Sequence, residues 1–285
     1  MQFLNFRQGG QNGLAVADGP DCKGLLVTDA HFPGSLQALL AQGPAALKQA
    51  ADALRKGRTI DLAQITYLPP LENPGRIWCI GLNYVDHSIE SGFAIPSYPA
   101  IFSRFSSSMT GHNAPIVRPK VSTQLDYEGE LVAVIGKAGR HIAKDKALEH
   151  VAGYSICNDA SIRDYQFKSG QWTIGKNFDD TGPFGPIFVT SDELPPGAAG
   201  LKIQTRLNGI VVQDASTSSL IFDVATLVSQ LSEAVCLQPG DVIVTGTPSG
   251  VGLARKPPLW MKHGDVCEVE IEGIGILRNP VVDEA

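Results

Sequence analysis

Four stretches of this chain carry side chains whose types and spacing could do chemistry, and the first is the DYEGE run at residues 126–130. Residues two apart share one face of a strand, so Glu128 and Glu130 would project side by side, and Asp126 could join them. Neighbouring carboxylates raise each other's pKa unless a cation lies between them, and carboxylate oxygens are the ligands that Mg²⁺ prefers. The run indicates a divalent metal site, and a solvated acidic strand end is the alternative that it leaves open.

A third carboxylate, Asp159, stands in SICNDASIRD, between an apolar stretch and a polar turn. Together with the two glutamates it could complete a set of three oxygen ligands for one divalent ion. Aspartate is also a common N-cap residue, so the alternative role of Asp159 is to cap a helix that begins near Ser161.

His87 and Glu90 form the second candidate, in GLNYVDHSIE. If this segment is one helical turn, the i, i+3 spacing places both side chains on one face. A glutamate that is hydrogen-bonded to an imidazole orients the ring and raises its basicity, as a general base needs. The alternative is an exposed surface pair. The sequence contains no H-E-x-x-H motif, so a zinc protease is excluded.

The third and fourth candidates are Lys176, within TIGKNFDDTGPFGP, and the glycine-rich stretch GDVIVTGTPSGVG at residues 240–252. An ammonium at Lys176 could face an anionic substrate or an oxyanion, and a plain solvated lysine is the alternative. Backbone N–H groups and threonine hydroxyls of the glycine-rich stretch could hold a carboxylate. Neither a P-loop nor a G-x-S-x-G nucleophile elbow is present.

Most of the elements that must position these residues read as strands. Apolar or alternating runs at residues 76–82, 130–137, 240–246 and 265–281 predict strands, and Asn208-Gly209 within residues 201–213 predicts a hairpin. The apolar spacing from Val224 to Val235 predicts one amphipathic helix. Strands are not followed regularly by helices, so we expect a mainly β, α+β fold rather than a doubly wound sheet.

The first 70 residues read as a small leading α/β unit. Short strands are predicted at its start, Ser35 is an expected N-cap, and a second helix is expected from Pro44 to about Arg55. The stretch YLPPLENPG at residues 67–75 is rich in proline and predicts a linker. We therefore divide the chain into a small N-terminal domain at 1–70 and a catalytic domain at 71–285.

The composition excludes several classes of protein. Hydrophobic residues make up 43% of the 285 residues, and the net charge of −6 provides no basic surface for nucleic acid or an anionic membrane. We find no apolar run of about 18 residues and no secretory signal, so no membrane partner is expected. Five scattered cysteines without a C-x-x-C pair favour a reducing, cytoplasmic location.

The order of these motifs resembles the fumarylacetoacetate hydrolase superfamily. GLNYVDH, PAIFSRFSSS, YEGELVAVIGK, NDASIRDYQ, GKNFDDTGPFGP and GDVIVTGTPSGVG follow one another between about Arg76 and Val281. The leading unit also resembles the small N-terminal domain of longer members. The resemblance implies a mixed β-sandwich roll and a homodimer.

The resemblance also implies roles for individual residues. Glu128, Glu130 and Asp159 would hold one Mg²⁺ or Mn²⁺ ion per subunit. His87 and Glu90 would be the water-activating dyad of a mobile lid, and Lys176 would lie beside the metal and stabilise an oxyanion. Gln166 and Thr247 match positions that contact the substrate carboxylate.

The reaction that the resemblance favours is hydrolysis of the C–C bond of an acylpyruvate, such as fumarylpyruvate, maleylpyruvate or a sugar-derived diketo acid, to pyruvate and a carboxylic acid. Hydrolysis is preferred because a histidine–glutamate dyad is present to activate water. The alternatives are decarboxylation of an oxaloacetate-type 2-oxo acid, isomerisation or hydration of a dienoate, and a catalytically silent binding protein. Arg104, where many members carry lysine, and Leu82, where small acylpyruvases tend to have arginine, bear on the acyl group, and the Arg104 fork favours a polar one.

Overall fold

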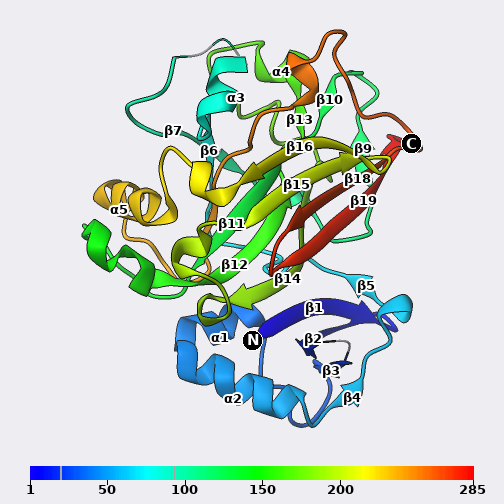
Figure 1. Ribbon diagram of the computed structural model, residues 1–285. Helices are drawn as coiled ribbons and strands as arrows, with labels where there is room; N and C mark the ends of the chain where they lie inside the picture. The colour runs from blue at the N-terminus through cyan, green and yellow to red at the C-terminus, as the bar shows by residue number, and fades with distance from the viewer. Residues whose placement is uncertain (20, 91, 93) are drawn as a thin grey trace.

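The computed structural model describes residues 1–19, 21–90, 92 and 94–285, and these residues fold around one large mixed sheet (Figure 1). Its path runs in the order β4-β3-β2-β1-β14-β12-β11-β17-β6-β7, with β5 paired to β1 and β8 to β14. The strands of this sheet are β1 (Gln2–Gln8), β2 (Gln11–Asp18), β3 (Asp21–Leu26), β4 (Arg58–Thr59), β5 (Thr66–Tyr67), β6 (Ile77–Gly81), β7 (Ala100–Arg104), β8 (Met109–Thr110), β11 (Gly129–Ile135), β12 (Val151–Asn158), β14 (Gly182–Thr190) and β17 (Val242–Val244).

A second sheet packs against the middle of the first, which makes the sandwich visible in Figure 1. Its order is β16-β15-β18-β19-β9, and a separate two-stranded ladder joins β10 to β13. These strands are β9 (Ile116–Arg118), β10 (Leu125–Asp126), β13 (Ser161–Ile162), β15 (Lys202–Leu207), β16 (Ile210–Ser216), β18 (Val266–Ile271) and β19 (Gly275–Asp283).

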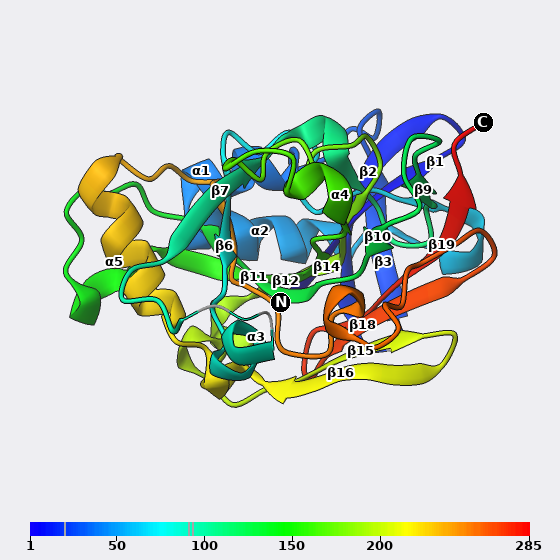
Figure 2. The same cartoon turned by 90° about the horizontal axis from the view of Figure 1, so that it is seen from above.

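Helices α1 and α2 pack on one face of the large sheet, and α5 packs on the face that the second sheet also covers (Figure 2). The α-helices are α1 (Leu36–Gln42), α2 (Pro44–Leu54), α3 (Val85–Glu90), α4 (Arg163–Gln166) and α5 (Val224–Ala234). Short 3₁₀ turns occur at η1 (Leu62–Gln64), η2 (Ser106–Ser108), η3 (Lys144–His150), η4 (Ser191–Glu193), η5 (Pro196–Ala198), η6 (Thr217–Ser219) and η7 (Gly252–Ala254). In the part of the chain that the structure describes, no helix combines the length and the apolar character needed to cross a membrane.

Strand β11 lies at the centre of the molecule because both of its faces are buried. Leu131, Ala133 and Ile135 face the core between the two sheets, whereas Val132 and Val134 pack in the core beneath α1 and α2. A strand that is buried on both faces needs a continuous apolar run, and residues 131–135 provide one. The E-x-E pair stands at the beginning of this strand, so two of the three candidate metal ligands are attached to a strand that is buried on both faces.

The local signals in the sequence correspond closely to the structure. Ser35 caps α1 by accepting a hydrogen bond from the N–H of Ala38 at 3.3 Å. Asn208 and Gly209 both have positive φ, 52° and 79°, at the β15–β16 turn, which is the conformation that a two-residue hairpin loop requires. The expected mainly β sandwich with a small α/β unit at its start is therefore confirmed.

The leading unit is joined to the rest of the fold by main-chain hydrogen bonds. Strand β1 pairs antiparallel with β14, with Phe3 opposite Phe188, so the large sheet is continuous across residue 70. The division into domains at 1–70 and 71–285 stays a prediction.

One histidine at this junction gives the fold a testable pH dependence. The His112 ring packs edge to face on Tyr67, with centroids 4.6 Å apart, and its Nδ1 accepts a hydrogen bond from the N–H of Arg278 at 3.0 Å. Burial, with the positive charge of Arg278, lowers the pKa of His112 to about 4. The folded state therefore holds the neutral imidazole.

We predict that the free energy of unfolding falls as the pH is lowered from about 6.5 to about 4, because the unfolded chain binds a proton at His112 in this window and the folded chain does not. His112→Asn keeps an acceptor near the position of Nδ1 but cannot titrate there, so it should lose less stability over the same range. Urea unfolding at pH 7 and at pH 4.5 measures the difference. Equal losses in both proteins would contradict a neutral, partly buried imidazole at His112.

Candidate active site

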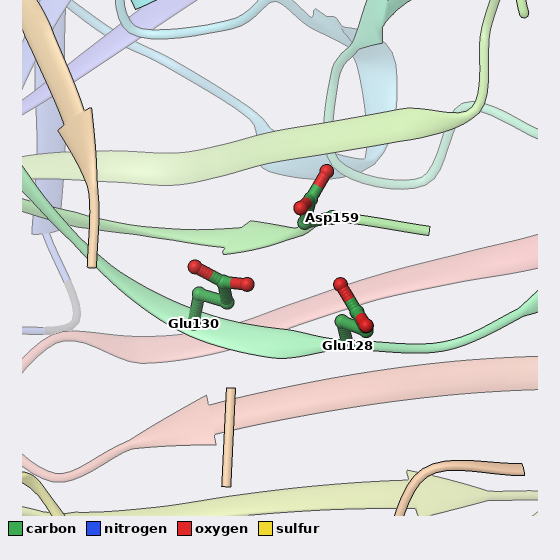
Figure 3. Close-up of side chains that lie close together, drawn as sticks. All are labelled: Glu128, Glu130 and Asp159. Atoms are coloured by element: carbon green, nitrogen blue, oxygen red, sulfur yellow. The ribbon is translucent and has the colours of Figure 1, made fainter. Parts of the chain in front are cut away.

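Three carboxylates meet where β11 begins and β12 ends (Figure 3). Strand β11 pairs with β12 so that Gly129 lies opposite Asn158, which brings the next residue, Asp159, beside Glu128. The N–H of Asp159 donates to the carbonyl of Glu128 at 2.8 Å and fixes this approach. One carboxylate oxygen from each of Glu128, Glu130 and Asp159 lies within 4.8 Å of the others. The three residues are 4%, 2% and 0% exposed, so a solvated strand end is excluded.

Cationic side chains surround two of these carboxylates. Lys176 Nζ donates to Glu128 Oε2 at 2.5 Å and to Asp159 Oδ2 at 2.7 Å. Arg104 Nη1 donates to the other oxygen of Asp159 at 2.6 Å, and Arg163 Nη2 donates to the other oxygen of Glu128 at 2.7 Å. Both of these carboxylates are therefore paired on each side.

Glu130 is the exception. The hydrogen bond described for its carboxylate comes from a neutral donor, the backbone N–H of Gly246. Burial, together with the charges of Asp159 and Glu128, raises the pKa of Glu130 well above its usual value. Burial also raises the pKa of Glu128, but Arg163 and Lys176 outweigh this effect and hold it at about 2. The two glutamates of one motif thus have opposite electrostatic environments.

This imbalance fits a bound divalent cation. A buried carboxylate that lacks a cationic partner is costly, and a metal ion would offset the negative charge at Glu130. The donor set consists of oxygens alone, which suits a hard cation. The residues present therefore fit the metal that the sequence indicated.

Two alternatives that the sequence left open, a helix cap at Asp159 and a solvated Lys176, are both wrong. Helix α4 starts at Arg163 without a side-chain cap, and the Asp159 carboxylate contacts Arg104 and Lys176 instead of a helix N-terminus. Lys176 is 2% exposed, so it is not a solvated lysine.

His87 and Glu90 lie on α3, which is one short helical turn as the spacing predicted. Nδ1 of His87 and Oε1 of Glu90 are 3.0 Å apart, which directs the other ring nitrogen, Nε2, away from the glutamate. Both oxygens of Glu90 accept from the N–H of Gly250, at 2.9 and 3.0 Å. Gly250 has a φ of 101°, and a Cβ there would lie 2.1 Å from the Val212 carbonyl oxygen, so this contact requires glycine. Since His87 is buried, it does not belong to an exposed surface pair.

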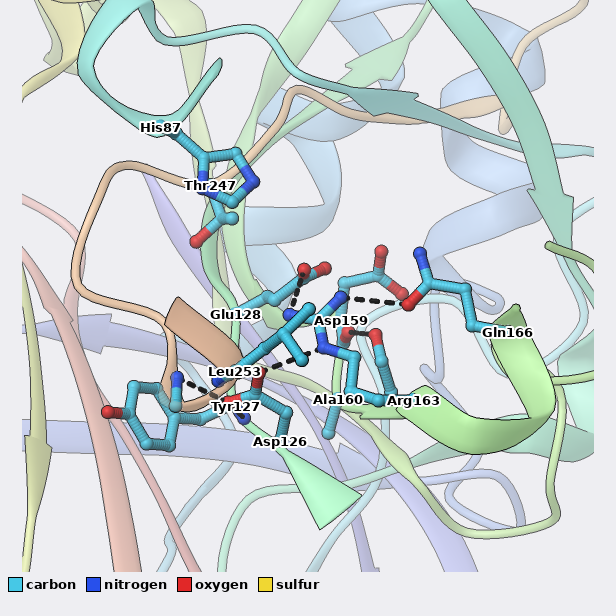
Figure 4. Close-up of polar contacts among 12 residues, drawn as sticks. His87, Asp126, Tyr127, Glu128, Asp159, Ala160, Arg163, Gln166, Thr247 and Leu253 are labelled. Carbon is cyan, nitrogen blue, oxygen red and sulfur yellow. Dashed lines mark hydrogen bonds and ion pairs between the residues drawn. The ribbon is translucent and has the colours of Figure 1, made fainter. Parts of the chain in front are cut away.

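Most of the predicted site residues line one cavity of about 300 Å³. The site residues that line it are His87, Glu128, Glu130, Asp159, Gln166, Lys176 and Thr247. The other two do not line it: Glu90, an exposed residue, contacts His87, and the buried Arg104 contacts Asp159 (Figure 4 shows His87, Thr247, Glu128 and Asp159). The structure therefore brings all nine predicted residues into one region.

The three residues predicted to contact substrate have different surroundings. Gln166 accepts from Arg163 Nη1 at 2.8 Å through its Oε1, which leaves its amide nitrogen for the cavity. The Thr247 hydroxyl donates to the Gly129 carbonyl at 3.0 Å. Arg104 is buried, and its guanidinium bonds within the protein to Asp159, the carbonyl of residue 160, and the hydroxyls of residues 108 and 181. Through these contacts Arg104 holds the Asp159 carboxylate in place. The substrate contacts expected of Arg104, Gln166 and Thr247 stay predictions.

Arg163 is a functional residue that reasoning from the sequence missed. It joins Asp126, Glu128 and Gln166 through hydrogen bonds of 2.7–2.8 Å (Figure 4). Asp126 in turn accepts from the N–H groups of Gly252 and Leu253, at 2.7 and 2.9 Å. Asp126 therefore anchors the loop over the site and is not a fourth member of the carboxylate triad. An arginine after a short strand has no local signal of burial, so only the fold could place it here.

This β-sandwich presents three buried carboxylates, at the ends of two central strands, to one cavity, and together they could hold a metal ion. A family model for the fumarylacetoacetate (FAA) hydrolase C-terminal domain matches residues 76–282, and the chain belongs to the fumarylacetoacetate hydrolase superfamily.

Individual relatives extend this likeness to nearly the whole chain. The chain is 42% identical over 273 residues to a protein of Xenopus laevis named oxaloacetate tautomerase fahd2, mitochondrial, covering 95% of this chain and 85% of that one. It resembles the solved fumarylacetoacetate hydrolase (EaFAH) from Exiguobacterium antarcticum, with a TM-score of 0.88, 37% identity and full coverage of both chains. It also resembles the 5-carboxymethyl-2-hydroxymuconate delta-isomerase of Mycobacterium smegmatis, with a TM-score of 0.78, 32% identity and full coverage of both chains.

The comparisons overturn the expected reaction class. Hydrolysis of a carbon–carbon bond was the preferred prediction, and it is wrong: curated relatives at about 40% identity are named oxaloacetate tautomerases, and a solved neighbour is an isomerase. The physical reason is that a histidine–glutamate dyad beside a metal site can take a proton from carbon as well as from water. The dyad therefore did not distinguish hydrolysis from isomerisation.

The expectations about location and partners are not confirmed by these findings. Several relatives are named as mitochondrial, so the cytoplasmic location stays a prediction. The homodimer and the exclusion of nucleic acid and membrane partners also stay predictions.

We predict that Glu130→Gln weakens the binding of Mn²⁺ by at least about tenfold, because even outer-shell partners of metal ligands contribute that much to affinity. The same change removes an unpaired buried charge, so the metal-free protein should not melt at a lower temperature. Titration calorimetry with Mn²⁺ and thermal unfolding in EDTA measure the two effects. Glu233→Gln, an exposed change on α5, is the matched control. Unchanged Mn²⁺ affinity in Glu130→Gln would contradict the metal site.

We predict that Arg104→Met lowers the free energy of unfolding by about 3–5 kcal/mol, because it leaves one side of the buried Asp159 carboxylate uncompensated. Arg55 forms an exposed ion pair with Asp18, so Arg55→Met should cost less than about 1 kcal/mol. Urea unfolding of both variants gives the comparison. A small effect at both positions would contradict a structural role for Arg104.

Proposed function

We propose that this protein is a divalent-metal-dependent isomerase that interconverts the keto and enol forms of a small 2-oxo acid of the oxaloacetate type. The observation that carries the proposal is the joint lining of one cavity by an acidic triad, Lys176 and the imidazole of His87. The names of the relatives at about 40% identity support the same reaction. Mg²⁺ or Mn²⁺, one ion per subunit, is the proposed cofactor, held by Glu128, Glu130 and Asp159.

A divalent ion at these carboxylates would supply Lewis acidity toward the carboxylate and 2-oxo group of the substrate. The residues of the chain provide the rest of the chemistry. Lys176 lies against Glu128 and Asp159, so its ammonium can stabilise negative charge that develops on the 2-oxo oxygen. The charges of Asp159 and Glu128 outweigh burial and raise the pKa of Lys176, so it stays protonated for this role.

His87 is the proposed base. Its Nδ1 faces Glu90, which favours the tautomer with the proton on Nδ1 and leaves a lone pair on Nε2. That lone pair can take the proton from C3 of the keto acid, and the imidazolium can return a proton to C3 in the reverse direction. Glu90 positions the ring and stabilises its charged form.

Glu90 is itself held in place by Gly250. Its carboxylate bonds to the backbone N–H of Gly250, and the loop that contains Gly250 is fixed by Asp126 two residues further on. The base therefore has a definite orientation relative to the carboxylates. Definite orientation of a proton acceptor contributes directly to the rate of proton transfer.

The likeness to a solved delta-isomerase supports a second candidate, double-bond isomerisation of an unsaturated 2-oxo or 2-hydroxy dicarboxylic acid. It uses the same proton transfer at carbon, with a conjugated C=C in place of a simple C3–H. Parallel assays with oxaloacetate and with a 2-hydroxy-2,4-dienedioate separate the two candidates by their kcat/KM values.

We predict that His87→Ala lowers kcat for oxaloacetate tautomerisation by about 10²–10⁴, the usual contribution of a general base, and that Glu90→Gln lowers it by less. The decay of the ultraviolet absorbance of enol-oxaloacetate, with Mg²⁺ present and the uncatalysed rate subtracted, measures both. Asp86→Asn is the matched control, because Asp86 is exposed on the same helical turn. Near-normal activity in His87→Ala would exclude His87 as the base, and absence of any activity in the unmodified protein would refute the proposed reaction.

A further inference from the structure

The cavity that holds the acidic triad also has an apolar side. Ile80, Leu82, Phe102, Trp172, Val251 and Leu253 line it together with the charged groups. Apolar lining with a few placed polar groups is typical of a small-molecule site, where the apolar part selects the substituent. The proposed reaction uses only the charged side, so the apolar side needs a separate explanation.

Two aromatic rings of this side are fixed against the reacting end of the cavity. Trp172 packs edge to face on Phe102, with ring centroids 5.5 Å apart. Lys176 Nζ lies 4.8 Å from the centroid of the Phe102 ring, a distance at which an ammonium is attracted to the ring face. Gly81 has no space for a Cβ, which would lie 2.3 Å from the Trp172 ring. The indole of Trp172 therefore has a defined position, and the Phe102 ring contacts both the indole and the Lys176 ammonium.

Leu82 adds an aliphatic surface at a conformational cost. Its φ is 57°, in the left-handed region that a leucine rarely adopts. Asn83 holds this conformation: its side chain accepts from the N–H of Phe222 and donates to the carbonyls of Phe222 and Thr245, at 2.7–3.0 Å. Strained residues that the surroundings hold in place are concentrated at functional sites. The fold thus maintains a costly conformation that keeps a leucine in the cavity wall.

The cations of the described lining are already engaged. Lys176 bonds to Glu128 and Asp159, and Arg163 bonds to Asp126, Glu128 and Gln166. Among the described lining residues, the cations Lys176 and Arg163 both have carboxylate partners, and the apolar side of the cavity carries no charge of its own. The cavity volume of about 300 Å³ lies at the lower end of the usual range for small-molecule sites, about 300–1,000 Å³, so it has room for a small ligand.

We propose that Leu82, Phe102 and Trp172 form a specificity wall that receives an uncharged aromatic group on C3 of the substrate, and that the protein tautomerises arylpyruvates as well as oxaloacetate-type acids. The inference rests on the proposed function, because the same base and carboxylates perform the reaction. One C3–H bond breaks and one O–H bond forms at the 2-oxygen, while the C=O double bond becomes a C=C double bond. The product is an isomer, so no further reactant is needed.

The test compares kcat/KM for phenylpyruvate with kcat/KM for oxaloacetate, in the presence of Mg²⁺ and with the uncatalysed rates subtracted. We expect the unmodified protein to use both acids. Trp172→Leu removes an aromatic surface, and Leu82→Arg places a cation in the wall. Each should lower the ratio of phenylpyruvate to oxaloacetate kcat/KM by about tenfold or more, the scale of discrimination for lost apolar contacts.

Ile174→Ala is the matched control, since Ile174 is exposed on the same segment as Trp172 and is absent from the described lining. A binding measurement separates recognition from catalysis. Benzoylformate is an aryl 2-oxo acid without a C3 hydrogen, so it can bind but cannot enolise. Its dissociation constant, measured by calorimetry with Mg²⁺ present, should rise about tenfold in Trp172→Leu and stay unchanged in Ile174→Ala.

The possible failures point to different errors. Turnover of oxaloacetate without turnover of phenylpyruvate would overturn the aromatic specificity and leave the proposed function in place. Turnover of neither acid would refute the proposed function. Equal ratios in the unmodified protein and in both wall variants, with benzoylformate affinity unchanged, would show that the wall does not select the substrate. If Trp172→Leu fails to fold, Leu82→Arg alone decides the outcome through the same ratio.

Discussion

The burial of Glu128, Glu130 and Asp159 in one place is the constraint on which the rest of the structure depends. Three carboxylates at the ends of β11 and β12 repel one another, and burial removes the water that would screen them. Two are matched by Lys176 and by an arginine each, and only the third is left with a neutral hydrogen-bond donor. Glu130 is therefore the carboxylate of the site whose negative charge has no cationic partner among the described contacts, and a hard cation bound there would offset it.

The same ion pairs extend from the centre of the fold to its surface. Arg163 connects Glu128 to Asp126, Asp126 holds the N–H groups that follow Gly250, and Gly250 holds Glu90 on α3. A continuous chain of hydrogen bonds thus runs from the candidate metal ligands to the candidate base. The imidazole is thus connected, through these hydrogen bonds, to Glu128, which is one of the carboxylates that would bind the metal.

Features that depend on neighbouring residues could be predicted from the sequence, whereas contacts between distant residues could not. The Asn208-Gly209 hairpin, the cap at Ser35 and the E-x-E pair before an apolar run all depend on neighbouring residues, and each lies where the sequence placed it. The buried ion pairs of Arg104 with Asp159 and of Arg163 with Glu128 could not be predicted from neighbouring residues, because the partners are 55 and 35 residues apart in the sequence. The continuity of β1 with β14 spans an even greater separation. The reaction type was missed for a chemical reason: one base and one metal site serve more than one proton transfer.

Strand β1 has a further consequence that concerns solubility rather than catalysis. A strand at the edge of a sheet presents unpaired N–H and C=O groups that can recruit another chain. Around Phe188 that edge of β14 is covered by β1, and the large sheet then continues to β4, a strand of two residues. The leading unit therefore moves this edge of the sheet from β14 to β3 and the two-residue β4, which pairs with Lys23 and Gly24 of β3. Guarding against edge-to-edge aggregation is a role that these residues can perform without touching the substrate.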